Sequence, residues 1–232
     1  MLPRITPVVK NLIIINVLML LADNSGLEIM ESLKGRAYIS DLFRPWQVVT
    51  HMFMHADFRH LLFNMFGLFF FGTALESYFG PKKFLFYYMS CGIGAFVLYQ
   101  LTQFIQLQFI MDNLSLEEIQ MAAKGSYNSL NPASEKYTGI YYPALVGASG
   151  AIFGLLIGFA TKFPETRVQL LFPPIPLTAK QLAIGYGALE LVMAVANVQG
   201  DNVAHAVHLL GGLMGYLIIK YWEKNNNQYR YN

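Results

Sequence analysis

The chain has 232 residues, of which 55% are hydrophobic, 15% aromatic and only 13% charged, and its formal net charge is +2. Soluble globular chains carry about 25% charged residues, so this composition excludes a disordered protein, a nucleic-acid-binding protein of the basic-patch type and an ordinary cytosolic enzyme. It indicates a polytopic membrane protein that is surrounded by a lipid bilayer. The single cysteine, Cys91, rules out an internal disulfide.

Apolar segments recur along the chain, and each is expected to form a spanning helix, because a span needs about 20 mostly apolar residues. The fold class predicted is therefore all-α, with six spans at residues 8–21, 58–79, 84–106, 148–161, 179–196 and 203–222. The first span lacks a convincing cleavage site after it, so we expect a retained helix rather than a signal peptide. We expect one membrane domain over residues 1–222 and a hydrophilic tail over 223–232.

The long polar segment 107–142 separates the third and fourth predicted spans. Within it, Ser115 is followed three residues later by Glu118 and then by an apolar pair. This spacing predicts a capping box at the start of a short surface helix.

The loop charges predict the orientation of the chain. With a cytoplasmic N-terminus, the outer loops hold Lys34, Arg36, Arg44, Arg59, Lys124 and Lys136. The cytoplasmic side then holds the larger set: Arg4, Lys10, Lys82, Lys83, Lys162, Arg167, Lys180, Lys220, Lys224 and Arg230. The positive-inside rule therefore favours both termini in the cytoplasm.

Polar side chains inside spans are candidate functional residues, because each is costly in a bilayer. Ser149 lies at the start of the fourth predicted span, within Gly147-Ala148-Ser149-Gly150. Backbone N–H groups at such a helix end can stabilise an anion, and small neighbours leave the hydroxyl accessible. The alternative explanation is a helix-packing patch of small residues.

Glycine stripes predict that the fourth and sixth spans pack backbone to backbone. The residues expected in this contact are Gly150, Gly154 and Gly158 on one side, and Ala204, His208, Gly211 and Gly215 on the other, and Gly147 is a further candidate for helix packing. Such packing would bring His208 within hydrogen-bond reach of Ser149, as a base for a serine nucleophile. A histidine that merely joins helices is the alternative. The nearest acid along the chain, Asp201, lies seven residues before His208, so a dyad is favoured over a triad.

His60 and Asn64 are four residues apart and share one face of the second predicted span. They offer two hydrogen-bond donors, and acyl transfer needs donors aimed at the developing oxyanion. Interhelical hydrogen bonding is the alternative role. The motifs of zinc metalloproteases, P-loop proteins and dinucleotide-binding proteins are absent from the sequence.

In this order along the chain, the motifs resemble those of the rhomboid intramembrane serine proteases, over residues 7–221. The segments that carry the resemblance are Gly147-Ala148-Ser149-Gly150, His208-x-x-Gly211-x-x-x-Gly215 and the stretch from His55 to Asn64. The resemblance implies a six-helix bundle with Ser149 as nucleophile and His208 as base. It implies an oxyanion site made by His60, Asn64 and the backbone N–H of Ser149.

The resemblance also implies transmembrane protein substrates, no cofactor and no metal, and an active site that opens to the outer face. A bacterial inner membrane is the expected location, and the oligomeric state stays open. Two positions depart from the family pattern: Gln47 follows Trp46 where arginine is frequent, and Phe153 stands where tyrosine is frequent. His205 is a second histidine one turn before His208.

Two alternatives to a protease follow from the same residues. One is a catalytically silent protein of the rhomboid fold that binds membrane clients. The other is a haem or metal membrane protein that uses the histidines His51, His55, His60, His205 and His208.

Overall fold

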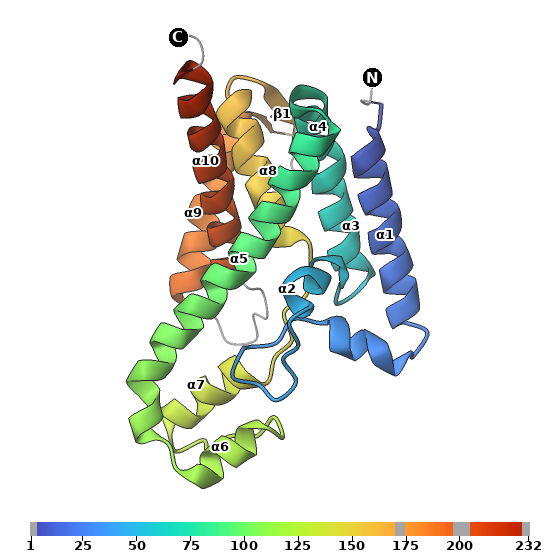
Figure 1. The fold of residues 1–232 in the computed structure, drawn as a ribbon. Coiled ribbons are helices and arrows are strands. Elements are labelled where there is room, and N and C mark those ends of the chain that lie inside the picture. The colour runs from blue at the N-terminus through green and yellow to red at the C-terminus, as the bar shows by residue number, and fades with distance from the viewer. Residues whose placement is uncertain (1–3, 170–174, 197–204, 229–232) are drawn as a thin grey trace.

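The computed structural model describes residues 4–169, 175–196 and 205–228, and it shows a bundle of long helices (Figure 1). The predicted all-α membrane fold is confirmed. The long helices of the bundle are α1 (Pro7–Asp23), α5 (Pro81–Ile110), α8 (Ser149–Lys162), α9 (Ala179–Ala196) and α10 (His205–Gln228), together with the continuous run α3 (Phe58–Gly67), η3 (Leu68–Gly72) and α4 (Thr73–Phe79). A short antiparallel hairpin, β1 (Arg167–Gln169) and β2 (Pro176–Thr178), precedes α9.

The helices follow the apolar segments closely. The predicted fifth span coincides with α9, and the predicted second span coincides with the run from α3 to α4. The start of the predicted sixth span, residues 203–204, lies outside the described residues. At its other end α10 continues to Gln228, so part of the predicted hydrophilic tail is helical, and Lys162 of α8 holds it through an ion pair of 2.7 Å with Glu223.

The run from α3 to α4 has defined ends. Asp57 caps its N-terminus by accepting a hydrogen bond of 2.8 Å from the His60 N–H. Gly80, with a φ of 79°, ends it in a conformation that favours glycine. The buried Glu76 carboxylate accepts hydrogen bonds of 3.0 and 2.9 Å from the N–H groups of Val8 and Val9. It therefore satisfies the free N-terminal donors of α1 and ties that helix to the bundle.

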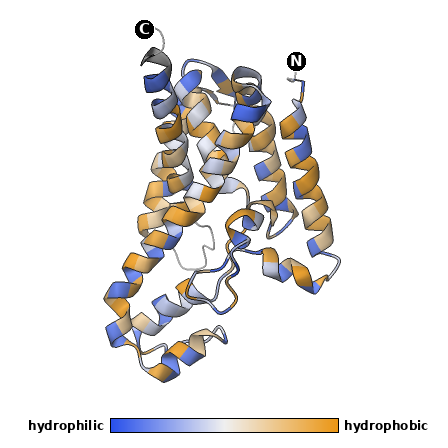
Figure 2. Cartoon of the chain, viewed as in Figure 1, coloured by the Kyte–Doolittle hydropathy of each residue, from blue (hydrophilic) through white to orange (hydrophobic). Residues whose placement is uncertain are grey.

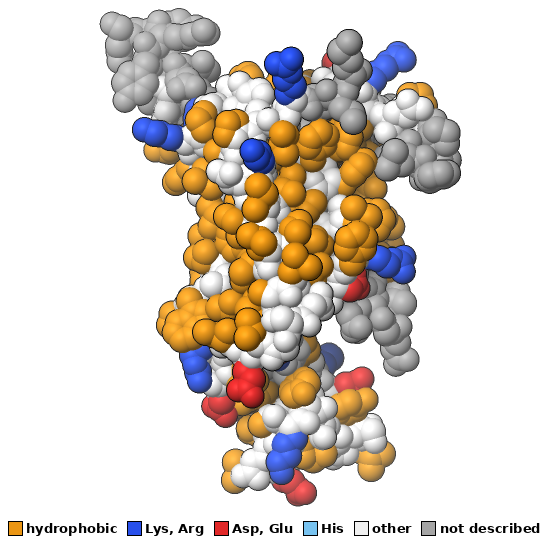
Figure 3. Space-filling model, turned by 90° about the vertical axis from the view of Figure 1, so that its right-hand side faces the viewer, with side chains coloured by type: hydrophobic (Ala, Val, Ile, Leu, Met, Phe, Trp, Pro, Cys, Tyr) orange, Lys and Arg blue, Asp and Glu red, His pale blue; other side chains and the backbone are white. Residues whose placement is uncertain are grey.

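Helix α8 is the centre of the bundle. It contacts α3, α4, α5, α9 and α10, and its buried apolar residues, such as Leu155, belong to the main core together with Tyr87 and Tyr88 of α5. The outer surface of the helices is also apolar, as Figures 2 and 3 show, with exposed side chains such as Leu18 and Val192. Among the described residues, three helical runs are long and apolar enough to cross a membrane: Phe58–Phe79, Pro81–Asn113 and Ala179–Ala196.

Shorter elements gather at the end of the bundle away from the start of α1 and the end of α10 (Figure 1). They are η1 (Glu28–Leu33), α2 (Gln47–Thr50), η2 (His51–Phe53), η4 (Met111–Asn113), α6 (Leu116–Ala122) and α7 (Pro132–Tyr141). A second apolar core, which includes Ala37, Leu107, Ala122 and Tyr141, joins them to the end of α5. The predicted capping box is present at the start of α6.

Glu118 of that capping box makes the segment sensitive to acid. Its carboxylate accepts hydrogen bonds of 2.9 Å from the Ser115 N–H, the Asn128 amide and the Asn131 amide, which lower its pKa to about 2. A depressed pKa stabilises the folded segment above the ordinary value of 4.5, and this stability is lost as pH falls towards 2. We expect about fivefold faster amide exchange in α6, after correction for intrinsic rates, when pH falls through this range. The variant Glu118→Gln should lack this pH dependence, and an unchanged profile in that variant would contradict the assignment.

Candidate active site

Ser149 is the first residue of α8, and its side chain is half-buried. The chain enters this helix through Gly147, whose φ of 121° favours glycine. A Cβ atom at Gly147 would also lie 2.8 Å from the His60 ring, so only glycine lets the chain pass so close to α3. Gly147 thus packs against α3.

His208 lies in the first turns of α10 and faces Ser149. The distance between His208 Nε2 and Ser149 Oγ is 2.8 Å, so the hydroxyl can donate to Nε2 when the ring carries its proton on Nδ1. Phe153, one turn after Ser149, stacks on the His208 ring with a centroid separation of 4.5 Å and an interplanar angle of 5°. The aromatic ring at this position therefore fixes the plane of the imidazole without needing a hydroxyl.

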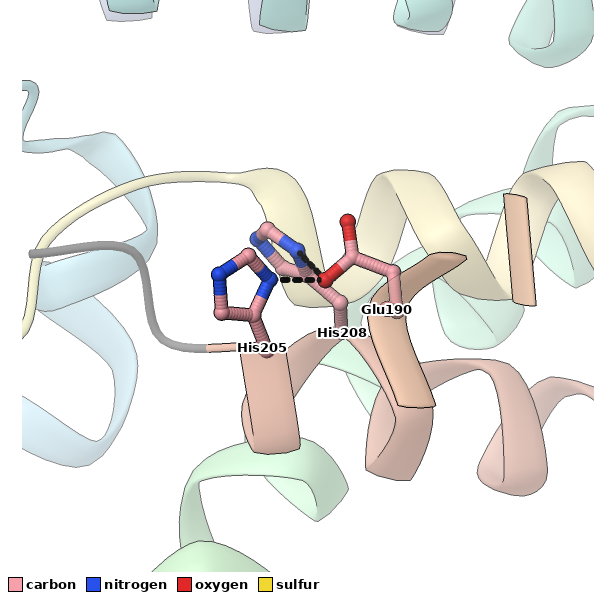
Figure 4. A group of neighbouring side chains, drawn as sticks. All are labelled: Glu190, His205 and His208. Atoms are coloured by element: carbon pink, nitrogen blue, oxygen red, sulfur yellow. Dashed lines mark hydrogen bonds and ion pairs between the residues drawn. The ribbon is translucent and has the colours of Figure 1, made fainter. Parts of the chain in front are cut away.

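A carboxylate that the sequence analysis did not consider lies on the other side of His208. Glu190 Oε2 of α9 is 3.0 Å from His208 Nδ1 and 2.6 Å from His205 Nδ1 (Figure 4). Spacing along the chain predicts only acids on the same helix as His208, whereas Glu190 comes from the neighbouring α9. Its signal in the sequence was an acidic residue within an otherwise apolar span.

His60 and Asn64 lie on one face of α3, next to the loop that leads to Ser149. The Asn64 side chain is buried, and its Nδ2 group has no hydrogen-bond partner among the described residues. A Cβ atom at Gly147 would lie 3.6 Å from this nitrogen, which places the free donor beside the turn into α8. Buried donors normally have hydrogen-bond partners, so an unpaired one needs an explanation. A bound ligand that accepts a hydrogen bond from Asn64 Nδ2 would supply it.

The two glycine stripes lie against each other where α8 crosses α10. A Cβ atom on Gly211 would lie 2.0 Å from the Gly150 carbonyl oxygen, and one on Gly215 would lie 2.7 Å from the Gly154 carbonyl oxygen. The helices are therefore in direct backbone contact, as is common where small residues line membrane helices. This contact sets the separation between Ser149 and His208. Ala204, which the sequence placed in the same stripe, lies outside the described residues.

We expect Gly211→Ala to lower both stability and any activity that depends on the Ser149–His208 contact. The added methyl group meets backbone rather than a movable side chain, so the helices must separate. A shift of about 1 Å in a catalytic contact can cost about 100-fold in rate. Thermal unfolding in detergent and turnover measure the two effects. The matched control is Gly185→Ala on α9, where a Cβ atom meets nothing within 4 Å; equal behaviour of the two variants would contradict the prediction.

The histidines do not form one cluster. His51 contacts the Gln47 carbonyl at 2.8 Å through Nδ1, and His55 packs edge-on against the His60 ring. Glu190, His205 and His208 do offer atoms within 4.8 Å of one another. Their Nδ1–Oε2 separations of 2.6 and 3.0 Å are shorter than the separation of about 3.3 Å between ligand atoms of tetrahedral zinc. We therefore interpret the group as a polar cluster in which His205 hydrogen-bonds to Glu190 and His208 lies at ion-pair distance from the same oxygen.

A family model, the Rhomboid domain, matches residues 43–224. The chain is a member of the rhomboid family. It is 28% identical over 180 residues to the putative rhomboid protease YdcA of Bacillus subtilis. This alignment covers 77% of the present chain and 70% of YdcA. It is also 28% identical over 170 residues to the mitochondrial Rhomboid protein 1 of Saccharomyces cerevisiae. The mitochondrial presenilin-associated rhomboid-like protein of Rattus norvegicus is 28% identical over 170 residues.

The chain spans 40% of the yeast protein and 36% of the rat protein. As a rhomboid with an apolar helical bundle, it is an integral membrane protein. The structure shows what Gln47 contacts at the position where arginine is frequent in the family. The buried Gln47 amide donates to the Ser32 and Leu42 carbonyls at 3.1 and 3.0 Å, and its oxygen accepts from the Arg36 N–H at 3.2 Å. A neutral amide thus joins the loop between α1 and α2 to α2.

Proposed function

We propose that this rhomboid is an intramembrane serine endopeptidase that hydrolyses peptide bonds in or near the transmembrane segments of other proteins. The observation that carries the proposal is the 2.8 Å contact between Ser149 Oγ and His208 Nε2. It joins a hydroxyl and an imidazole from two helices that are in backbone contact, next to an unpartnered amide donor on a third. A nucleophile, its base and an oxyanion donor are the parts that acyl transfer requires.

The reaction begins when Ser149 Oγ attacks the scissile carbonyl carbon and its proton passes to His208 Nε2. The carbonyl oxygen then carries negative charge, which Asn64, His60 and the backbone N–H of Ser149 stabilise. Collapse of the tetrahedral intermediate breaks the C–N bond, and His208 gives its proton to the leaving amine. Water, with His208 again as base, hydrolyses the acyl-enzyme and restores Ser149. These steps need neither a metal nor an organic cofactor.

The substrate class follows from the backbone. A helical segment keeps its amides in internal hydrogen bonds, so a transmembrane substrate must unwind locally before Ser149 can reach a carbonyl. Segments with small or helix-weakening residues near one membrane surface are the expected targets. Because the end of α10 and the start of α1 lie at the same end of the bundle, the first turn of α10 with His208 lies towards the opposite end (Figure 1). With cytoplasmic termini, as the loop charges favour, the site opens towards the outer face of a bacterial inner membrane.

Cleavage and covalent labelling test the proposal together. Purified protein in detergent is given a panel of fluorogenic transmembrane peptides, and in parallel a fluorophosphonate that reacts with activated serines. The wild type is expected to cleave at least one peptide and to be labelled at Ser149, whereas Ser149→Ala should do neither. Labelling without cleavage would indicate a competent site and an unsuitable panel.

The alternative hypothesis, a catalytically inactive member of the family that binds other membrane proteins, predicts the opposite result. It requires no labelling of Ser149 and no cleavage, with binding of transmembrane peptides unaffected by Ser149→Ala. That combination would overturn the endopeptidase proposal.

A further inference from the structure

Glu190 is an unusual residue for its place in the fold. It is the one acidic residue of α9, a helix apolar enough to cross a membrane, and only 8% of its surface is exposed. A buried carboxylate in such a helix is costly unless charged or hydrogen-bonding groups pair with it. Its position therefore needs an explanation in terms of its partners.

The partners are two imidazoles of α10. His205 Nδ1 lies 2.6 Å and His208 Nδ1 lies 3.0 Å from the same oxygen, Glu190 Oε2 (Figure 4). The other ring nitrogen of His208 faces Ser149 Oγ at 2.8 Å. Serine, imidazole and carboxylate thus follow one another in a line of contacts, in the order that a catalytic triad requires.

We propose that Glu190 is a positioning residue that completes a Ser149–His208–Glu190 triad, with His205 holding the carboxylate. The inference rests on the proposed endopeptidase function. Glu190 Oε2 lies at ion-pair distance from His208 Nδ1, so its negative charge favours the neutral tautomer with the proton on Nδ1 and leaves the Nε2 lone pair free to accept the Ser149 proton. When Nε2 takes that proton, the ring becomes an imidazolium and the negative charge of Glu190 stabilises it. Glu190 stays ionised throughout, so no proton is transferred to it.

His205 accounts for the orientation of Glu190. By contacting Oε2 at 2.6 Å, it keeps that oxygen between the two rings rather than turned towards lipid. The titratable groups that face His208 among the described residues are Glu190 from α9, His205 on α10 and His60 from α3. Only Glu190 among them carries negative charge, so it alone can stabilise the protonated base.

The arrangement also ties the base to the position of α9. Ser149, Phe153 and His208 belong to the tightly packed pair α8 and α10, but the carboxylate belongs to a third helix. Any displacement of α9 from α10 would separate Glu190 from His208 and weaken the base. Activity is therefore expected to require α9 in the position that the structure shows.

Charge removal at constant shape tests the proposal. In Glu190→Gln, we expect kcat to fall about 10²- to 10⁴-fold while KM changes little, because substrate does not touch this residue. The midpoint of the acidic limb of the pH–activity profile should move to lower pH, since an imidazolium without its anion forms less readily. Glu190→Asp keeps the charge and should recover part of kcat and the original midpoint.

Controls separate this inference from the proposed function. Glu165→Gln removes a carboxylate from the exposed loop before β1 and should leave kcat unchanged. An active wild type with an unaltered Glu190→Gln would overturn the triad and leave the endopeptidase intact. A loss of kcat in Glu190→Gln without movement of the pH midpoint, or without recovery in Glu190→Asp, would reduce Glu190 to a structural role.

A second readout holds even if no peptide is cleaved. Nitrogen NMR of labelled imidazole should find the His208 proton on Nδ1 in the wild type, and a redistribution between the two ring nitrogens in Glu190→Ala. An identical tautomer in both proteins would overturn the proposal. So would a transition metal that copurifies with the protein and is lost in Glu190→Ala, because the group would then be a metal site.

Discussion

Alanine at Ser149, alanine at His208 and alanine at both positions are expected to lower kcat by the same factor, about 10⁵ to 10⁶. The reason is that a serine hydroxyl is a poor nucleophile unless a base accepts its proton, and His208, 2.8 Å away, is that base. Without Ser149, the base has no nucleophile to activate. Once either partner is missing, removing the other costs little more. Turnover of a transmembrane peptide in detergent, measured with large amounts of enzyme, gives the three values.

Non-additivity is the part of this result that identifies a catalytic unit. Two residues that support the fold independently would give losses that multiply, and additive free energies in the double variant would therefore contradict the dyad. Ser129→Ala, on the exposed loop between α6 and α7, is the matched control and should retain full activity. Thermal unfolding of each variant shows whether the bundle is intact, because Ser149 and His208 contribute few buried apolar contacts.

Many features of the fold depend only on residues that are close in the sequence, and these features are predicted well. A mostly apolar segment delimits α9 to the residue, and the Ser115–Glu118 spacing is enough to predict the cap of α6, because both depend on neighbours within one helix. The glycine stripes predict which faces meet, since only residues without a side chain allow backbone contact. The contact of Ser149 with His208 follows from those stripes, although 59 residues separate the pair.

Contacts set by the rotation of one helix against another are not local, and the sequence does not reveal them. Whether Glu190 of α9 points at lipid or at His208 depends on the rotation of α9, which neighbouring side chains decide. Similarly, the motif around Ser149 suggests that Gly147 serves helix packing, but the sequence does not reveal its positive φ or that His60 of α3 is its neighbour. The three backbone partners of Gln47 also depend on how the loop between α1 and α2 folds, so the sequence does not predict them.

Replacing Asn64 by alanine is expected to lower kcat about 10²- to 10³-fold, which is the usual cost of one oxyanion donor. The Asn64 Nδ2 group is buried and has no partner among the described residues, so the folded protein gains nothing from it before substrate binds. Its removal should therefore leave thermal stability unchanged or slightly higher, because an unsatisfied buried donor costs about 1–3 kcal/mol. Turnover and the melting temperature in detergent should thus move independently.

The matched control is a second buried asparagine whose amide nitrogen has a hydrogen-bond partner. Asn16 of α1 is fully buried and donates a hydrogen bond of 2.7 Å to the Leu12 carbonyl, while its Oδ1 atom has no partner among the described residues. Asn16→Ala should lower the melting temperature and leave kcat intact, the reverse of the pattern at Asn64. If Asn64→Ala instead loses stability and activity together, its amide serves the packing of α3 and not the oxyanion. If Asn64→Ala lowers only kcat and Asn16→Ala lowers only the melting temperature, the Asn64 amide does not contribute to folding. Its role is then to stabilise the transition state.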